Sequence, residues 1–213
     1  MLATADISEI IRLFEKCYPD ELCTLKYDKD FQLLFAARLA AQCTDARVNT
    51  VTPTLFSRFP TLESLAEADV SDIENIIHPC GFYRTKARDI IMASQMLLSH
   101  YDGRVPGTMD ELLTLPGVGR KTANLMLGDI FGKPAVVVDT HCIRLSNRIG
   151  LVDTKDPVKI ESVLREILPP EKSSDFCHRL VLHGRAVCTA RNPNCAGCCI
   201  AKFCATGKGT LTL

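Results

Sequence analysis

The sequence contains no apolar run of the roughly 18 residues that a membrane-spanning helix requires. It also lacks a secretory leader, because its first residues, Met1–Asp6, are not a basic stretch followed by an apolar one. These two absences exclude a membrane protein and a secreted one. They predict a soluble, cytoplasmic protein with no targeting signal.

An excess of charge of one sign is also missing, since 25 basic residues balance 25 acidic ones. Bulk charge therefore does not indicate nucleic-acid binding, for which a basic domain is typical. The charge is unevenly distributed, however, because no acidic residue follows Asp175. Basic residues do follow it, namely Arg179, Arg185, Arg191, Lys202 and Lys208. Such a tail is a solvated basic face, a phosphate contact or a counterweight to an anionic metal cluster.

Strand patterns and flexible linkers are scarce. Only Ala135–Val138 resembles a strand, and four residues between Pro134 and Asp139 predict an extended connector. No repeat or linker rich in glycine, serine or proline divides the chain, and the clearest boundary is Gly132–Pro134. Apolar residues at helical spacing predict an all-α fold. The helices are expected over residues 7–17, 31–41, 70–77, 85–100, 109–114, 121–131, 157–168 and 174–186.

Cysteine, in contrast, is abundant, with eleven residues of which five lie between positions 188 and 204. An odd number packed in this way argues against a disulfide framework and favours a metal site. Four of them follow the spacing C-x6-C-x2-C-x5-C: Cys188, Cys195, Cys198 and Cys204. Thiolates select zinc or iron–sulfur clusters.

The cysteine spacing has one short pair flanked by wider gaps, which favours a cuboidal cluster over a zinc module. Zinc remains an alternative, and so do buried cysteines without a metal. Cys199 directly follows Cys198, and the two side chains would both have to bend back to ligate. We therefore leave Cys199 out of the predicted ligand set.

The segment Leu-Pro-Gly-Val-Gly-Arg-Lys at residues 115–121 predicts a hairpin between two helices. Gly117 and Gly119 permit positive φ angles and close approach of another backbone. The amides of Val118 and Gly119, beside the start of a helix, would form an anion site. A DNA phosphate is the ligand that this pattern favours, with contacts independent of base sequence. The alternative is a helix–helix turn that glycine merely stabilises.

Lys121 is expected in the first turn of the helix that follows the hairpin. Positive charge is unfavourable there because the helix dipole presents its positive end, and Arg120 adds to the effect. Both favour an uncharged amine, which is a nucleophile. Asp139 follows the extended connector and supplies a carboxylate at the start of the next helix. The alternatives are a phosphate contact for Lys121 and a helix cap for Asp139.

The hairpin 115–121, the Val138–His141 segment and the cysteine tail, in this order and spacing, resemble the endonuclease III family of helix–hairpin–helix glycosylases. The resemblance runs from about Phe31 to Cys204 and implies an all-α fold of two lobes with a DNA cleft between them. One lobe is a six-helix barrel over residues 23–133 that contains the helix–hairpin–helix. The other is an iron–sulfur domain made of residues 1–22 and 134–213, with one [4Fe–4S] cluster.

The resemblance also implies a bifunctional DNA glycosylase and AP lyase of base excision repair that removes oxidised pyrimidines. Lys121 would form a Schiff base with the abasic sugar and cut the strand by β-elimination, with Asp139 as the catalytic aspartate. The partner would be double-stranded DNA that contains oxidised bases or abasic sites. The protein would act as a monomer associated with the nucleoid.

Two further positions match residues that the family uses in base flipping. Gln42 corresponds to a glutamine that fills the gap left by the extruded base, and Phe82 to an apolar wedge that is often leucine. Gln42 as a helix cap and Phe82 as a core residue are the alternatives. Thr140 and His141 complete the predicted DNA contacts. The neutral net charge departs from the family and predicts weak DNA affinity that moderate salt abolishes.

Two other functions remain open. A related glycosylase that removes adenine opposite oxidised guanine shares the hairpin and the cluster, but lacks the hairpin lysine. A non-catalytic DNA-binding iron–sulfur module would need neither Lys121 nor Asp139. The presence of both residues favours the lyase.

Overall fold

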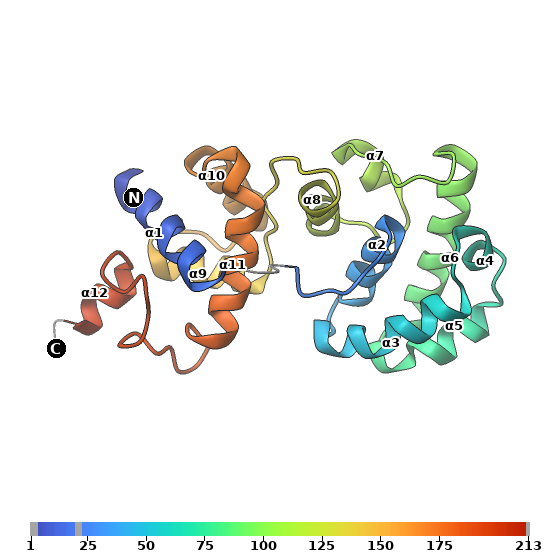
Figure 1. Cartoon of the computed structure of the whole chain (residues 1–213), viewed down its shortest axis with the longest axis horizontal. Coiled ribbons are helices and arrows are strands. Elements are labelled where there is room, and N and C mark those ends of the chain that lie inside the picture. Colours follow the sequence, from blue (N-terminus) through green and yellow to red (C-terminus); the bar gives the residue numbers. More distant parts are fainter. Residues whose placement is uncertain (1–3, 20–22, 212–213) are drawn as a thin grey trace. The chain divides into compact units, whose positions relative to one another are not determined.

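The computed structural model describes residues 4–19 and 23–211, and over these residues it holds helices and loops without a strand (Figure 1). The predicted all-α fold is therefore confirmed. None of the described helices has the length and hydropathy needed to cross a membrane. The chain divides into two compact units, Cys23–Phe131 and Gly132–Leu213 with Met1–Leu22. Residues 20–22, beside one of the two predicted domain boundaries, lie outside the described residues.

The unit Cys23–Phe131 contains seven α-helices among its described residues, where the resemblance implied a six-helix barrel, and two of the seven are very short. They are α2 (Asp30–Leu39), α3 (Asp45–Arg58), α4 (Leu62–Ala66), α5 (Val70–Ile77), α6 (Tyr83–His100), α7 (Met109–Thr114) and α8 (Arg120–Asp129). A 3-10 turn, η1 (His78–Cys80), precedes α6. Fully buried leucine and isoleucine side chains from several of these helices form the core.

The predicted helix boundaries in this unit need corrections at three helices. Helix α2 spans Asp30–Leu39 instead of 31–41, α6 begins at Tyr83 instead of residue 85, and α8 spans Arg120–Asp129 instead of 121–131. Helices α3 and the short α4 were not predicted. Helix α3 is capped by Thr44, whose side chain accepts a hydrogen bond from the Arg47 amide, and it accommodates Pro53 in its interior.

The other unit contains α1 (Thr4–Cys17), α9 (Thr140–Ile149), α10 (Pro157–Ile167), the 3-10 turn η2 (Pro170–Lys172), α11 (Ser173–Ala186) and α12 (Ala205–Leu211). The predicted extended connector Ala135–Val138 is confirmed, because these residues form neither helix nor strand. Ala135 and Val136 are fully buried, and the Ala135 amide donates to Ser173 Oγ at 3.1 Å. The connector therefore holds the start of α9 in a fixed place within this unit.

Candidate functional site

The hairpin Leu115–Gly119 joins α7 to α8 as predicted, and Gly117 has a left-handed φ of 75°. The Val118 amide donates to Leu115 O at 3.1 Å, so the expectation that this amide is available to an anion is wrong. Ala123 donates the first backbone hydrogen bond of α8, to Gly119 O. The amides at the start of α8 therefore have no acceptor within the helix. Any anion site lies at these amides and not at Val118.

Gly117 also packs directly on an ion pair. A Cβ atom at this position would lie 2.5 Å from Arg38 Nε and 2.7 Å from Asp89 Oδ2. Arg38 on α2 donates to the Asp89 carboxylate on α6 through Nε at 2.7 Å. Its Nη2 atom lies 2.6 Å from Asp89 Oδ2. Glycine is therefore required here both by its φ angle and by the close approach of two other helices.

Lys121 lies in the first turn of α8, where its side chain is exposed. Among the described residues it has no hydrogen-bond or ion-pair partner. The ammonium group is thus not committed to a structural contact, which leaves the amine available to a ligand at the end of the hairpin.

Asp139 caps α9, as the simpler alternative for this residue predicted. Its Oδ1 accepts a hydrogen bond from the Cys142 amide at 2.8 Å. The side chain is half-buried, and within the described part of the chain Oδ2 has no hydrogen-bond partner. A cap uses one carboxylate oxygen. The cap therefore orients the carboxylate and leaves its second oxygen for another partner.

Thr140 and His141 form the first two positions of α9. Thr140 is exposed, whereas His141 is half-buried and faces α11. A Cβ atom on Gly184 would lie 2.5 Å from His141 Nδ1, and the Arg144 guanidinium lies 3.1 Å from the same nitrogen. The structure therefore ties His141 to its own unit, while Thr140 faces solvent.

Gln42 and Phe82 share an unusual backbone. Both have left-handed φ angles, 54° and 48°, which are uncommon outside glycine. Gln42 lies in the exposed loop between α2 and α3, and Phe82, which is 66% exposed, immediately precedes α6. Gln42 is not a helix cap, since Thr44 caps α3, and Phe82 is not a core residue, since it is exposed. Both alternatives are therefore wrong.

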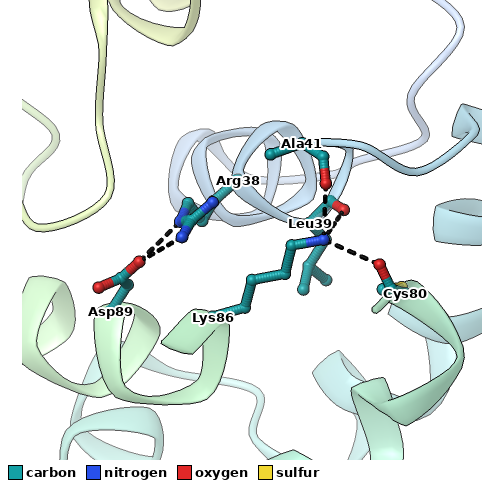
Figure 2. A network of polar contacts seen from close by, with 6 residues as sticks. All are labelled: Arg38, Leu39, Ala41, Cys80, Lys86 and Asp89. Atoms are coloured by element: carbon teal, nitrogen blue, oxygen red, sulfur yellow. Dashed lines mark hydrogen bonds and ion pairs between the residues drawn. The ribbon is translucent and has the colours of Figure 1, made fainter. Parts of the chain in front are cut away.

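Lys86 is a buried lysine that the sequence analysis did not identify. It is 1% exposed, and its Nζ donates to the carbonyl oxygens of Leu39, Ala41 and Cys80 at 2.8, 2.8 and 2.9 Å (Figure 2). Burial lowers the pKa of this lysine. The available signal was its position on the face of α6 that also carries Ala87 and Ile90. A lysine on a buried face must find acceptors.

The four predicted ligand cysteines line one cavity of about 400 Å³, counted with its opening to solvent: Cys188, Cys195, Cys198 and Cys204. Burial raises the pKa of the Cys198 thiol, and the other three cysteines add to the rise. Among the described residues, no three cysteine, histidine or acidic side chains are gathered closely enough to hold a single metal ion. The sulfurs instead surround a cavity.

Two basic side chains on α9 support the cysteine loop. Arg148 donates to Cys188 Sγ at 3.3 Å and to the carbonyl oxygens of Thr189 and Ala190. Arg144 donates to the carbonyl oxygens of Gly184 and Cys188, both at 3.1 Å. Positive charge therefore lies against the loop that carries the thiols.

His183 on α11 links the same loop to the segment that follows α1. Its Nε2 lies 3.3 Å from Cys198 Sγ, and its Nδ1 lies 2.9 Å from the Tyr18 hydroxyl. Burial lowers the pKa of His183 to about 4 and raises the pKa of Tyr18 to about 12. A neutral imidazole therefore accepts from Tyr18 at Nδ1 and can donate from Nε2 to the sulfur.

Cys199, which we left out of the ligand set, has different surroundings. Cys199 is not among the described residues that line the cavity. Burial first, and then a hydrogen bond with Cys17, raises the pKa of Cys199 to about 12. This cysteine contacts the end of α1 instead of the other four thiols.

Comparisons with known proteins agree with the motifs. The family model of the HhH-GPD superfamily base excision DNA repair proteins matches residues 35–170. Endonuclease III from Synechocystis is 47% identical over 204 residues, which are 95% of this chain and 93% of that protein. A solved non-covalent endonuclease III–DNA complex superposes with a TM-score of 0.92, 40% identity and full coverage of both chains.

A second solved structure, a trapped endonuclease III–DNA covalent intermediate in an estranged-adenine complex, has the same TM-score and identity and covers 99% of this chain and 100% of that one. The family match spans more than half of the sequence, and the curated relative covers nearly all of it. The chain therefore belongs to the HhH-GPD superfamily of base excision DNA repair proteins and, within it, to the endonuclease III family of DNA glycosylases with AP lyase activity.

Proposed function

We propose that this protein removes oxidised pyrimidines from double-stranded DNA and cuts the resulting abasic site, with Lys121 as the nucleophile. The observation that carries the proposal is the exposed amine of Lys121, without a partner among the described residues, at the first turn of the helix that follows the hairpin. A related endonuclease III has been trapped in a covalent complex with DNA, which a nucleophilic amine would explain.

The proposed reaction begins with attack of the Lys121 amine on C1′ of the damaged nucleotide. The bond between Nζ and C1′ forms, the glycosidic bond breaks, and the base leaves with a proton. The sugar ring then opens to give a protonated Schiff base. Removal of a proton from C2′ expels the 3′ phosphate, which is β-elimination, and water releases the lysine. No oxidant or reductant is required.

Asp139 is proposed to stabilise the positive charge that develops on the sugar as the base leaves. The cap bond from the Cys142 amide to Oδ1 fixes the carboxylate, and Oδ2 remains for the sugar or for a proton. The helix cap and the catalytic role are thus compatible, because they use different oxygens.

The Asp139→Asn variant separates these two roles. Asparagine keeps a side-chain oxygen that accepts from the Cys142 amide, so the free energy of unfolding should change by less than about 1 kcal/mol. Loss of the negative charge should lower the rate of base release by about 100-fold or more. Thermal unfolding and single-turnover base release measure the two effects. If base release stays at the wild-type rate, Asp139 is only a cap.

DNA contacts are proposed for the hairpin residues Gly117 and Gly119, for Thr140 and His141, and for Gln42 and Phe82. The amides at the start of α8, which have no acceptor within the helix, support phosphate binding at the hairpin. The exposure of Gln42 and Phe82 supports insertion into the duplex, because a residue that fills the gap left by a flipped base must project into solvent.

We also propose that the four cysteines that line the cavity hold one [4Fe–4S] cluster. Four thiols that line one cavity, with Arg148 directed at Cys188 Sγ, fit a cluster of negative charge. When bound, the cluster would tie the loop 188–204 to α9 and α11 and so supply folding free energy to this segment. Arg144, Arg148 and His183 orient the cysteine loop through their hydrogen bonds.

Borohydride trapping tests the proposed function. The purified protein is incubated with a duplex that contains one abasic site, with and without borohydride, and with an undamaged duplex as the control. We expect a stable protein–DNA adduct on the abasic duplex alone and, without borohydride, a strand cut on the 3′ side of the site. Adenine release without an adduct would support the mismatch glycosylase instead. Binding with neither product would leave a DNA-binding module.

A further inference from the structure

We infer that Lys86 is a positioning residue for DNA engagement, because its buried ammonium fixes the two loops that present Gln42 and Phe82. The inference rests on the proposed roles of those two residues. It explains how one side chain on α6 sets the conformation of both loops.

The geometry of Lys86 is that of a complete three-way contact. A lysine ammonium has three N–H donors and no acceptor. The three acceptors are the carbonyl oxygens of Leu39, Ala41 and Cys80, at 2.8 to 2.9 Å (Figure 2). The side chain is 1% exposed, so water does not compete for these bonds. Removing the ammonium would leave three carbonyl oxygens, two of them in buried contacts, without this donor.

One of the three carbonyl groups directly precedes Gln42, and another lies two residues before Phe82. The Ala41 carbonyl belongs to the peptide group that ends at the Gln42 nitrogen, against which the φ angle of Gln42 is defined. The Cys80 carbonyl belongs to the peptide group that precedes Gly81, whose φ is 67°. Phe82 follows with a φ of 48°. Lys86 therefore holds the peptide group that precedes Gln42 and the one that precedes the left-handed pair Gly81 and Phe82.

Left-handed conformations at non-glycine residues persist only where the surrounding structure imposes them. Three such residues occur in the described part of the chain, and two of them are Gln42 and Phe82. Both are exposed, so their own side chains have little packing to hold them in place. The hydrogen bonds from Lys86 Nζ to the backbone carbonyl oxygens supply this restraint.

The same face of α6 also supports the hairpin. Asp89, three residues after Lys86, binds Arg38 of α2, and the hairpin residue Gly117 packs on this ion pair. Helix neighbours at this spacing lie on one face. One face of α6 thus contacts the Gln42 loop, the Phe82 loop and the glycine hairpin, all within a single compact unit.

A buried ammonium suits this task better than an apolar side chain. The Leu39 and Ala41 carbonyl groups lie at the carboxyl end of α2, where the helix dipole favours positive charge. Burial lowers the pKa of Lys86, and the neighbouring thiols Cys80 and Cys43 oppose that change. Methionine has a similar length and no donor, so Lys86→Met removes the three hydrogen bonds with little change in volume.

The test uses a duplex with the fluorescent adenine analogue 2-aminopurine opposite an abasic-site analogue. Fluorescence of the analogue reports whether protein side chains enter the stack. The wild-type protein should change the fluorescence at saturating DNA, and Lys86→Met should lose most of this change. Its rate of base release from damaged duplex should fall about 10- to 100-fold, as for reacting groups misplaced by about 1 Å. Trapping on a single-stranded abasic oligonucleotide, which needs no base flipping, should stay near the wild-type level.

Two controls separate positioning from a general loss of stability. Leu97→Ala opens a cavity in the same helix eleven residues away and should leave the fluorescence change intact at a temperature where both variants are folded. In a Gln42→Ala/Phe82→Ala background, Lys86→Met should cause little further loss, because the residues through which it acts are already absent. Lys86→Gln, which keeps two donors, should give an intermediate result and serves if Lys86→Met does not fold.

The outcomes distinguish the inference from the proposal on which it rests. If Gln42→Ala/Phe82→Ala behaves as the wild type, the proposed roles of these two residues are wrong. If that double variant is impaired while Lys86→Met and Lys86→Gln keep the fluorescence change, the positioning role is wrong. An equal loss from Lys86→Met in both backgrounds, or a loss shared by Leu97→Ala, would also overturn it and show a merely structural lysine.

Discussion

The Lys121→Ala variant is expected to give no borohydride-trapped adduct and to lose strand cleavage at an abasic site by at least about 1,000-fold, as enzymes do without their nucleophile. Lys121 is exposed and has no partner among the described residues, so its loss should leave the free energy of unfolding almost unchanged. Trapping, cleavage rate and thermal unfolding, measured on one preparation, test the three parts of this expectation.

The Lys121→Arg variant is the matched control, because the alternative role for this residue is a phosphate contact. Arginine keeps a positive charge at the start of α8 but does not act as an amine nucleophile. We expect duplex binding close to that of the wild type and no adduct. Substantial trapping by either variant would assign the Schiff base to another amine.

Replacement of Cys198 by serine is expected to have the second largest effect. The wild-type protein should be brown, with a broad visible absorption and about four iron atoms per chain. Cys198→Ser should lose most of this colour and iron. It should also unfold at a lower temperature, because the loop that the ligands close has little other structure. Absorption, iron analysis and thermal unfolding provide the measurements.

Cys199→Ser is the control for that experiment, since the neighbouring thiol contacts Cys17 and not the cavity. This variant should keep the iron and the colour. A colourless wild-type protein that contains zinc would establish the zinc alternative. Equal loss of iron from both variants would contradict the assignment of Cys199 as a non-ligand.

Local patterns predicted much of this fold. Helix α7 has the predicted limits Met109 and Thr114, and α5 has the predicted limits Val70 and Ile77. The sequence signals for these two helices are short-range. They are the capping residues Asp69 and Thr108 and the spacing of apolar residues within each helix. The hairpin at Gly117 was predictable for the same reason, because a turn depends on adjacent residues.

Helix α3 was not predictable in this way, since Pro53 interrupts its sequence and threonines weaken its helical signal. Packing of Val48 and Leu55 into the core outweighs these local costs. The prediction that the Val118 amide is available to an anion failed for a different reason. The hairpin satisfies it internally, and a sequence does not reveal which amides a turn will use.

The long-range contacts of the site were also beyond local patterns. Lys86 is more than forty residues from Leu39 and Ala41 in the chain, and Tyr18 is 165 residues from His183. Each of these polar groups is identifiable only after burial has brought its partner to it. The motif residues can be predicted from their type and spacing, whereas the residues that position them cannot.

Identification of the amine that carries the DNA tests the central claim most directly. The borohydride-reduced adduct would be digested with protease and nuclease, and the modified peptide sequenced by mass spectrometry. We predict a reduced sugar on Nζ of Lys121. A modification on the N-terminal amine, or on another lysine such as Lys133, with an unmodified Lys121 peptide, would contradict the account.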